Sequence, residues 1–203
     1  MQGGDSSRRA RGQAHTLEAL AGSLLLVGAL VFALQVTAVT PLSASTSSQH
    51  IENQQQATAA GVLSAAVEEG TLRDAVLYWN DGSDPQRFHD AVGQRYYVDR
   101  APPNGLGTLL DRAFASRAIV YNVYVHYEED GRRKPQRMVY RGEPSDNAVS
   151  TSVTLTLYDD DVLRNDDGDP TTTSLSSADF YAPDAHAGGV YNVLEVEVVA
   201  WRQ

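Results

Sequence analysis

The feature that most restricts the fold of this chain is an uninterrupted apolar run near its N-terminus. Residues 19–39 contain no charged side chain and a single amide, Gln35. At a helical rise of about 1.5 Å per residue the run spans roughly 31 Å, which matches a bilayer hydrocarbon core of about 30 Å. The run therefore predicts a transmembrane helix over residues 19–40, and a lipid membrane is the first expected partner.

The charges that flank the run predict its orientation. Three arginines precede it within residues 8–11, and the next basic residue is Arg73. Basic residues favour the cytoplasmic side of a membrane segment. We therefore expect a single-pass protein of the cell membrane, with a cytoplasmic basic leader over 1–18 and an extracellular domain over 41–203.

A cleaved secretory signal is a second interpretation of the same run. The apolar core of such a signal is about 7–15 residues long and is followed by small residues at the cleavage site. The sequence TAVTPLSAS, which begins at Thr37, offers small residues of this kind. The run is longer than such a core, which favours the membrane helix, but this cleavage remains an alternative.

A short motif at the entrance of the run indicates an assembly role. Its residues are Arg11-Gly12-Gln13 followed by Thr16-Leu17-Glu18. They resemble the class III signal of archaeal pilins and archaellins, in which a prepilin peptidase cuts on the cytoplasmic side and the apolar helix stays with the mature protein. The resemblance implies cleavage between Gly12 and Gln13, with Glu18 as the sixth mature residue. Bacterial type IV pilins have a glutamate at the fifth mature position, so the spacing differs by one.

Glu18 itself has two interpretations. A carboxylate at the edge of a membrane is costly unless a cation pairs with it. In a filament, the free α-amino group of a neighbouring subunit would be such a cation. Alternatively, the carboxylate lies at the level of the lipid headgroups and is solvated there.

Longer stretches of the chain resemble a wider family. They are TPLSASTSSQHIENQQQATAAGVL, YWND, GEPSDNAVSTSVTLTLYDDD and YNVLEVEVVAW. They are similar to uncharacterised haloarchaeal membrane proteins with pilin-like N-termini. This resemblance covers most of residues 11–203 and implies an archaeal, halophilic source, but it brings no activity and no site with it.

The charge balance agrees with a salt-adapted chain. The formal net charge is −10, and Lys134 is the only lysine among 16 basic residues. Concentrated salt screens the repulsion between carboxylates, because the Debye length falls to about 3 Å at an ionic strength of about 1 M. An ordinary acidic protein would share this balance. The acidic excess, without a basic stripe, argues against nucleic-acid binding.

The chain after the apolar run begins with helical periodicity. Pro41 is expected to end or kink the membrane helix. Apolar residues then recur every three or four positions, which predicts a helical stalk over 46–69. This stripe comprises Ile51, Ala59, Val62, Leu63, Ala66 and Val67. A second apolar stripe predicts a helix over 105–116.

Further along the chain, apolar and polar residues alternate one by one. The alternation predicts strands near 118–127, 136–141, 149–158 and 190–201. Such strands have one buried and one wet face, so their apolar face needs a cover, and the stalk is the expected cover. The predicted fold is therefore α+β: an N-terminal transmembrane helix continues into a helical stalk that backs an antiparallel β-sheet, an architecture that is pilin-like.

Few residues suggest chemistry. The acidic loop 159–169 invites a calcium interpretation, but the register of an EF-hand loop would put Leu163 at its first ligand position, so a solvated turn is favoured. The five histidines lack metal-ligand spacing, cysteine is absent, and neither a nucleophile elbow nor a phosphate-binding loop occurs. We therefore expect no catalytic residue, no metal, no cofactor and no enzymatic activity.

Two non-enzymatic functions follow from these patterns. The first is a membrane-anchored, pilin-like surface subunit that is processed by a prepilin peptidase and assembles through its N-terminal helix, with itself or with other pilin-like subunits. The second is a monomeric, signal-anchored surface or envelope protein whose outer domain binds a partner. A new N-terminus at Gln13 and self-contact of the apolar helix would distinguish the first from the second.

Overall fold

The computed structural model describes the backbone of residues 5–202, and it describes the side chains in this range except at 5–15, 35–48 and 116. The longest element is helix α1, Asp5–Glu68. The chain divides into two compact units, an N-terminal unit, Met1–His50, and a C-terminal unit, Ile51–Gln203. Helix α1 therefore contributes residues to both units.

The N-terminal unit contains the apolar run. Residues Thr16–Leu34 form a helix long and apolar enough to cross a membrane, and every side chain in this range is exposed. The large apolar side chains include Leu20, Leu25 and Phe32. A helix that is apolar on all sides is typical of a membrane span, although a signal sequence near an N-terminus has the same length and composition.

Helix α1 does not end at Pro41, contrary to one of the two outcomes that the sequence predicts there. The predicted stalk over 46–69 is instead the last part of α1, which ends at Glu68. A proline inside a helix removes one backbone hydrogen bond, but it does not interrupt α1 here. The helix ends where Gly70 adopts a positive φ of 73°, a conformation that favours glycine.

Two further α-helices and a short 3₁₀ helix belong to the C-terminal unit. They are α2 (Thr71–Leu77), α3 (Gly105–Phe114) and η1 (Ala115–Arg117). Asn104 caps α3, because its side-chain oxygen accepts a hydrogen bond of 3.3 Å from the backbone N–H of Gly107. A Cβ at Gly107 would lie 1.8 Å from the carbonyl oxygen of Pro102, so the chain needs a glycine at this turn.

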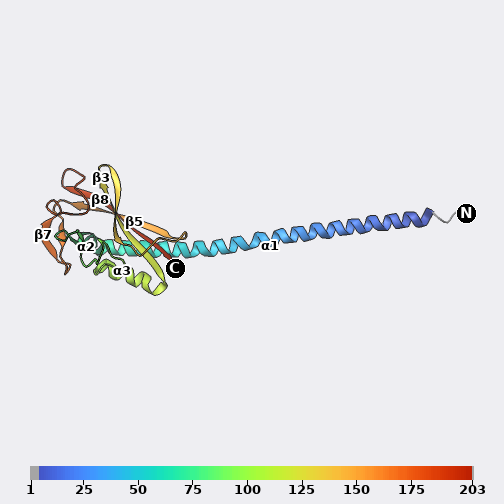
Figure 1. Ribbon diagram of the computed structural model, residues 1–203, viewed down its shortest axis with the longest axis horizontal. Helices are drawn as coiled ribbons and strands as arrows, with labels where there is room; N and C mark the ends of the chain where they lie inside the picture. The colour runs from blue at the N-terminus through green and yellow to red at the C-terminus, as the bar shows by residue number, and fades with distance from the viewer. Residues whose placement is uncertain (1–4, 203) are drawn as a thin grey trace. The chain divides into compact units, whose positions relative to one another are not determined.

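The main sheet has four antiparallel strands. They are β3 (Ile119–Glu129), β4 (Arg132–Val139), β5 (Val149–Tyr158) and β8 (Val190–Arg202), in the spatial order β4-β3-β8-β5. Figure 1 labels three of them, β3, β8 and β5. Asp130 and Gly131 both have positive φ, which suits the tight turn between β3 and β4. Helices and an antiparallel sheet in one unit confirm the α+β class.

The inner face of this sheet packs against the helices in a single hydrophobic core. Helix α1 contributes Ala59, Val62, Leu63 and Ala66, which are all buried. The strands contribute the inward members of their alternating pattern, among them Val123, Val125, Leu157, Leu194, Val196 and Val198. The last part of α1 therefore covers the apolar face of the sheet.

Four short strands have no counterpart in the sequence-based prediction. Strands β1 (Trp79–Asn80) and β2 (Arg87–Phe88) pair with each other, and so do β6 (Val162–Arg164) and β7 (Pro170–Ser174). Each is too short for an alternating pattern to stand out from its surroundings.

The segment 86–104, whose sequence shows no period, contacts the outer edge of β4 through Tyr97. The N–H of Tyr97 donates to the carbonyl of Met138 at 2.9 Å, and the N–H of Tyr140 donates back to Tyr97 at 2.9 Å. A segment held by a few backbone bonds at an edge needs no long alternation, which explains its irregular sequence.

Candidate binding surface on the outer face of the sheet

The residues that the entrance motif assigns to processing and assembly lie in the range of α1. Glu18 is exposed on this helix. The side chains of Gly12 and Gln13 lie outside the described residues. Cleavage between them therefore stays a prediction.

The acidic stretch 159–169 includes β6 and the turn that leads to β7. Asn165 organises the turn, since its side-chain oxygen accepts hydrogen bonds from the backbone N–H groups of Asp167 (3.1 Å) and Asp169 (2.8 Å). Within the part of the chain that the structure describes, no three His, Asp or Glu side chains gather so that they could hold a metal ion. The two hydrogen bonds to the Asn165 side chain therefore connect groups of the turn with one another.

Polar side chains gather on the face of the main sheet that points away from the core, here called the outer face. The register brings them together across strands: Tyr124 of β3 faces Arg137 of β4, and Thr154 of β5 faces Glu195 of β8. The outer face also carries His126, Glu128, Arg133, Pro135, Ser152 and Glu197. Two grooves lie among these residues.

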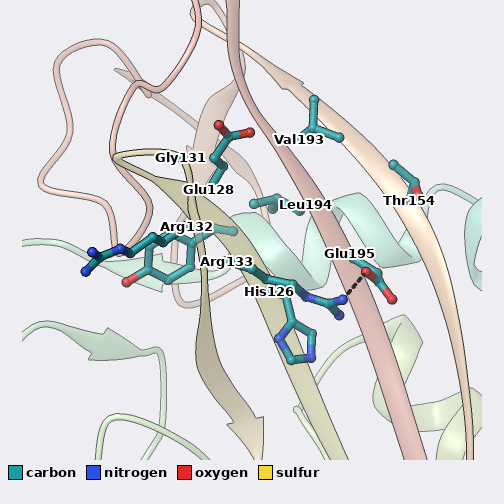
Figure 2. A pocket seen from close by; sticks show the side chains of 10 residues that line it. His126, Glu128, Gly131, Arg132, Arg133, Thr154, Val193, Leu194 and Glu195 are labelled. Atoms are coloured by element: carbon teal, nitrogen blue, oxygen red, sulfur yellow. Dashed lines mark ion pairs between the residues drawn. The ribbon is translucent and has the colours of Figure 1, made fainter.

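The first, the ion-pair groove, has a volume of about 380 Å³ and is lined by His126, Tyr127, Glu128, Gly131, Arg132, Arg133, Thr154, Val193, Leu194 and Glu195. The guanidinium of Arg133 reaches across β3 to Glu195, with 2.8 Å between Nη1 and Oε2 (Figure 2). The imidazole Nε2 of His126 lies 2.8 Å from Oε2 of Glu197, also on β8. Arg133 and Glu195 of this groove therefore form an ion pair with each other, whereas His126 pairs with a carboxylate outside the lining.

The electrostatics of the ion-pair groove favour the charged form of Glu195. A hydrogen bond from Ser152, followed by the charge of Arg133, holds the pKa of Glu195 below its ordinary value, although partial burial opposes this. The Ser152 side chain therefore stabilises this carboxylate.

The second groove, here called the tyrosine–arginine groove, has a volume of about 460 Å³. It is lined by Gln94, Arg95, Tyr96, Tyr124, Pro135, Gln136 and Arg137. The guanidinium of Arg137 lies 4.0 Å from the ring centroid of Tyr140 and 5.6 Å from that of Tyr96. The guanidinium of Arg95 lies 5.2 Å from the ring of Trp79. Aromatic faces, rather than carboxylates, hold both arginines.

Arg133 of the ion-pair groove therefore contacts a carboxylate, whereas the arginines of the tyrosine–arginine groove contact aromatic rings. Among the described residues, no carboxylate oxygen lies within 4.0 Å of the guanidinium of Arg95 or Arg137. Tyr124 is half-buried beside them, and burial raises its pKa, with a hydrogen bond from Asn122 and the charge of Arg137 acting in the opposite direction. The hydroxyl of Tyr124 therefore stays neutral and can donate a hydrogen bond to a ligand.

The strand alternation already places Tyr124 and Arg137 on polar faces, but the sequence gives no sign that they share a groove. Tyr96 comes from the irregular segment 86–104, and only the backbone bonds of Tyr97 bring it beside β4. A clustering of tyrosine and arginine near positions 94–97 and 135–140 is the one signal that the sequence holds for this groove.

Comparison with known proteins places almost the whole chain in one family. No curated protein and no solved structure matches it. Residues 11–200 match a family of unknown function, DUF7288. The match extends from the segment before the apolar run to the last strand of the sheet. The chain therefore belongs to the DUF7288 family.

Proposed function

We propose that this protein is a non-enzymatic, membrane-anchored surface subunit held in the bilayer by α1. One observation supports the proposal most directly: residues Thr16–Leu34 expose every side chain, while the C-terminal unit buries its own apolar residues in a separate core. A helix with a largely apolar surface satisfies its backbone internally and is stable in lipid. The arginines before it favour a cytoplasmic N-terminus and an extracellular C-terminal unit.

The same helix supports a pilin-like assembly role. Before assembly, lipid surrounds the helix, and after assembly, copies of itself do. A Cβ at Gly28 would meet no atom within 4 Å, which leaves room for a second helix to approach closely. With the entrance motif at Gly12, Gln13 and Glu18, this favours a subunit that a prepilin peptidase processes and that packs against other pilin-like subunits. Its acidic excess suits a halophilic, archaeal cell surface.

Crosslinking in native membranes tests the self-assembly. The chain contains no cysteine, so Gly28→Cys introduces a single thiol. We expect disulfide-linked dimers when these membranes are oxidised. Leu30→Cys is the matched control, because it lies at a similar depth about 200° around the helix. Equal crosslinking at both positions, or none at either, would rule out a specific helix–helix contact.

Mass spectrometry of the membrane form tests the processing. Cleavage by a prepilin peptidase leaves a new N-terminus at Gln13, and Gly12→Leu should block it. If every preparation keeps an intact Met1 end or begins beyond residue 40, the prepilin interpretation is wrong.

The tyrosine–arginine groove favours a second candidate function, a monomeric, signal-anchored surface protein whose outer domain binds a partner. This candidate predicts an uncleaved N-terminus and no dimer from Gly28→Cys. Binding at the groove is compatible with either function, whereas the state of the N-terminus separates them.

A further inference from the structure

The strongest unexplained feature of the C-terminal unit is the position of Arg137. Its guanidinium lies against Tyr140 and near Tyr96, whose rings form an edge-to-face pair with centroids 6.1 Å apart. Stacking on ring faces orients a guanidinium without consuming its N–H donors. The side chain is exposed, and no hydrogen bond from its guanidinium is seen among the described residues. Arg137 is therefore an oriented cation with donors available to a ligand.

Arg95 adds a second cation to the same groove. Its Nε donates a hydrogen bond of 2.8 Å to the carbonyl of Gln86, and its guanidinium lies over Trp79. This arrangement fixes one edge of the group and leaves its terminal amino groups for another acceptor. Two oriented guanidinium groups in one groove of a chain with net charge −10 point to a carboxylate ligand, because the planar fork of arginine matches a carboxylate.

The remaining lining indicates the rest of the ligand. A hydrogen bond of 3.1 Å from Asn122 to the hydroxyl of Tyr124 fixes this ring on the outer face. An aromatic ring offers a flat face to C–H groups and a hydroxyl to polar groups. Gln94 and Gln136 contribute amides to the lining. A sugar ring has an apolar face and a rim of hydroxyl groups. It therefore fits a groove lined by an aromatic ring and by amides.

A peptide strand fits this place less well. An extended peptide usually adds to a free sheet edge, where its backbone forms most of the bonds. Tyr97 already pairs with this edge of β4 through its bonds to Met138 and Tyr140. The volume of about 460 Å³ lies within the range of small-ligand sites.

We propose that the tyrosine–arginine groove binds an acidic carbohydrate, with a sugar carboxylate on Arg137 and the adjoining sugar ring against Tyr124. The repulsion between a chain of net charge −10 and an anionic ligand acts over a long distance and is screened by salt, whereas the contact with Arg137 is short. Binding is therefore best measured near 1 M salt, where the Debye length is about 3 Å. This site does not depend on the mode of membrane anchoring.

Calorimetric titration of the full chain in detergent, with a trisaccharide of galacturonic acid, tests the proposal. We expect saturable binding that is at least about tenfold tighter than that of the neutral galactose trisaccharide, because a charged hydrogen bond is lost with the carboxylate. Arg137→Gln should weaken binding by about tenfold or more. Arg112→Gln is the matched control, since Arg112 is exposed on α3, outside the groove, and its loss changes the net charge equally.

Two further variants separate geometry from charge. Arg137→Lys keeps the charge but loses the planar fork, so it should bind nearly as weakly as Arg137→Gln. Tyr124→Leu should weaken binding severalfold, whereas Tyr158→Leu, at the exposed end of β5, should not. The unfolding temperature of each variant shows whether its fold is intact. Arg137→Gln and Arg137→Lys should both fold, because the side chain of Arg137 is exposed.

Three results would overturn the proposal. The first is no detectable binding of the acidic trisaccharide. The second is an equal loss with Arg112→Gln, which would show that only net charge matters. The third is Arg137-dependent binding of triglutamate as tight as that of the sugar, which would make the ligand an acidic peptide.

Discussion

Two stretches of the same helix treat their apolar residues in opposite ways. In residues 16–34 of α1, leucines such as Leu25 are 76% exposed, whereas Leu63, farther along α1, is 2% exposed. Both stretches are helical, so helix propensity does not account for the difference. From residue 19 onward the first stretch carries apolar side chains on all sides, whereas the second has one apolar stripe with exposed amides at Gln54 and Gln56. A stripe is buried by one neighbour, but a helix that is apolar all round needs an apolar solvent.

The largest expected effect comes from placing one charge in each stretch. Leu63→Asp puts a carboxylate in the core and should destabilise the C-terminal unit by about 4 kcal/mol or more. Leu25→Asp should leave the stability of that unit unchanged within about 0.5 kcal/mol, because the sites are independent. Urea unfolding in lipid nanodiscs, followed by the fluorescence of Trp79 and Trp201, measures the effect, since both tryptophans are buried in the C-terminal unit.

The reverse result is expected for membrane insertion. Leu25→Asp should weaken insertion by about 3–4 kcal/mol, and vesicle flotation measures this loss. Leu63→Met is the control for a change of shape without charge and should cost less than about 1.5 kcal/mol in the unfolding assay. If Leu25→Asp lowers the stability of the C-terminal unit as much as Leu63→Asp, the two stretches do not occupy different solvents.

The elements that sequence patterns reveal here are those with many repeats of one period. The stripe from Ala59 to Ala66 and the alternation along β3, β5 and β8 each repeat several times, so the α+β class and the cover of the sheet could be predicted. Strands β1, β2, β6 and β7 have two to five residues and carry no such repetition. Pro41 shows that a single residue is a weak signal for a helix end, because α1 continues through it.

The candidate groove could not be predicted for a different reason. Alternation places Tyr124 and Arg137 on a polar face, but their meeting with Tyr96 depends on a distant segment that bonds to the edge of β4. Such pairing depends on backbone bonds that no side-chain pattern reports. The carboxylate that pairs with Arg133 also comes from another strand, so the sequence does not show which arginines have such a partner.

A moderate loss of stability is expected where a polar bridge, in addition to the core, connects α2 to β5. Arg73 of α2 pairs with Asp161 at 2.5 Å and donates a hydrogen bond of 2.8 Å to the carbonyl of Thr156 at the edge of β5. Arg73→Met leaves both acceptors without this donor, so it should lower the free energy of unfolding by about 1–3 kcal/mol. Urea unfolding measures the loss, and vesicle flotation should not change.

Arg117→Met is the matched control for Arg73→Met. Arg117 is exposed, and its described contact is a long hydrogen bond of 3.4 Å to Thr58. Its replacement should change the stability by no more than about 0.5 kcal/mol. Equal losses at the two positions would mean that the bridge from α2 to Asp161 adds nothing beyond ordinary surface contact.

The smallest effect is expected on the outer face of the sheet, where charges meet near solvent. The pair of Arg133 and Glu195 is partly exposed, so Glu195→Gln should cost about 0.2–1 kcal/mol near pH 7. Because the pKa of Glu195 is lowered in the folded chain, its contribution is present above the ordinary carboxyl value of 4.5 and is lost as the pH falls through the folded pKa. The difference in unfolding free energy between the natural chain and Glu195→Gln should therefore shrink on acidification. If the difference stays constant well below pH 4.5, the charge of Glu195 does not cause it. The variant would then act through packing, as a substitution in the core does.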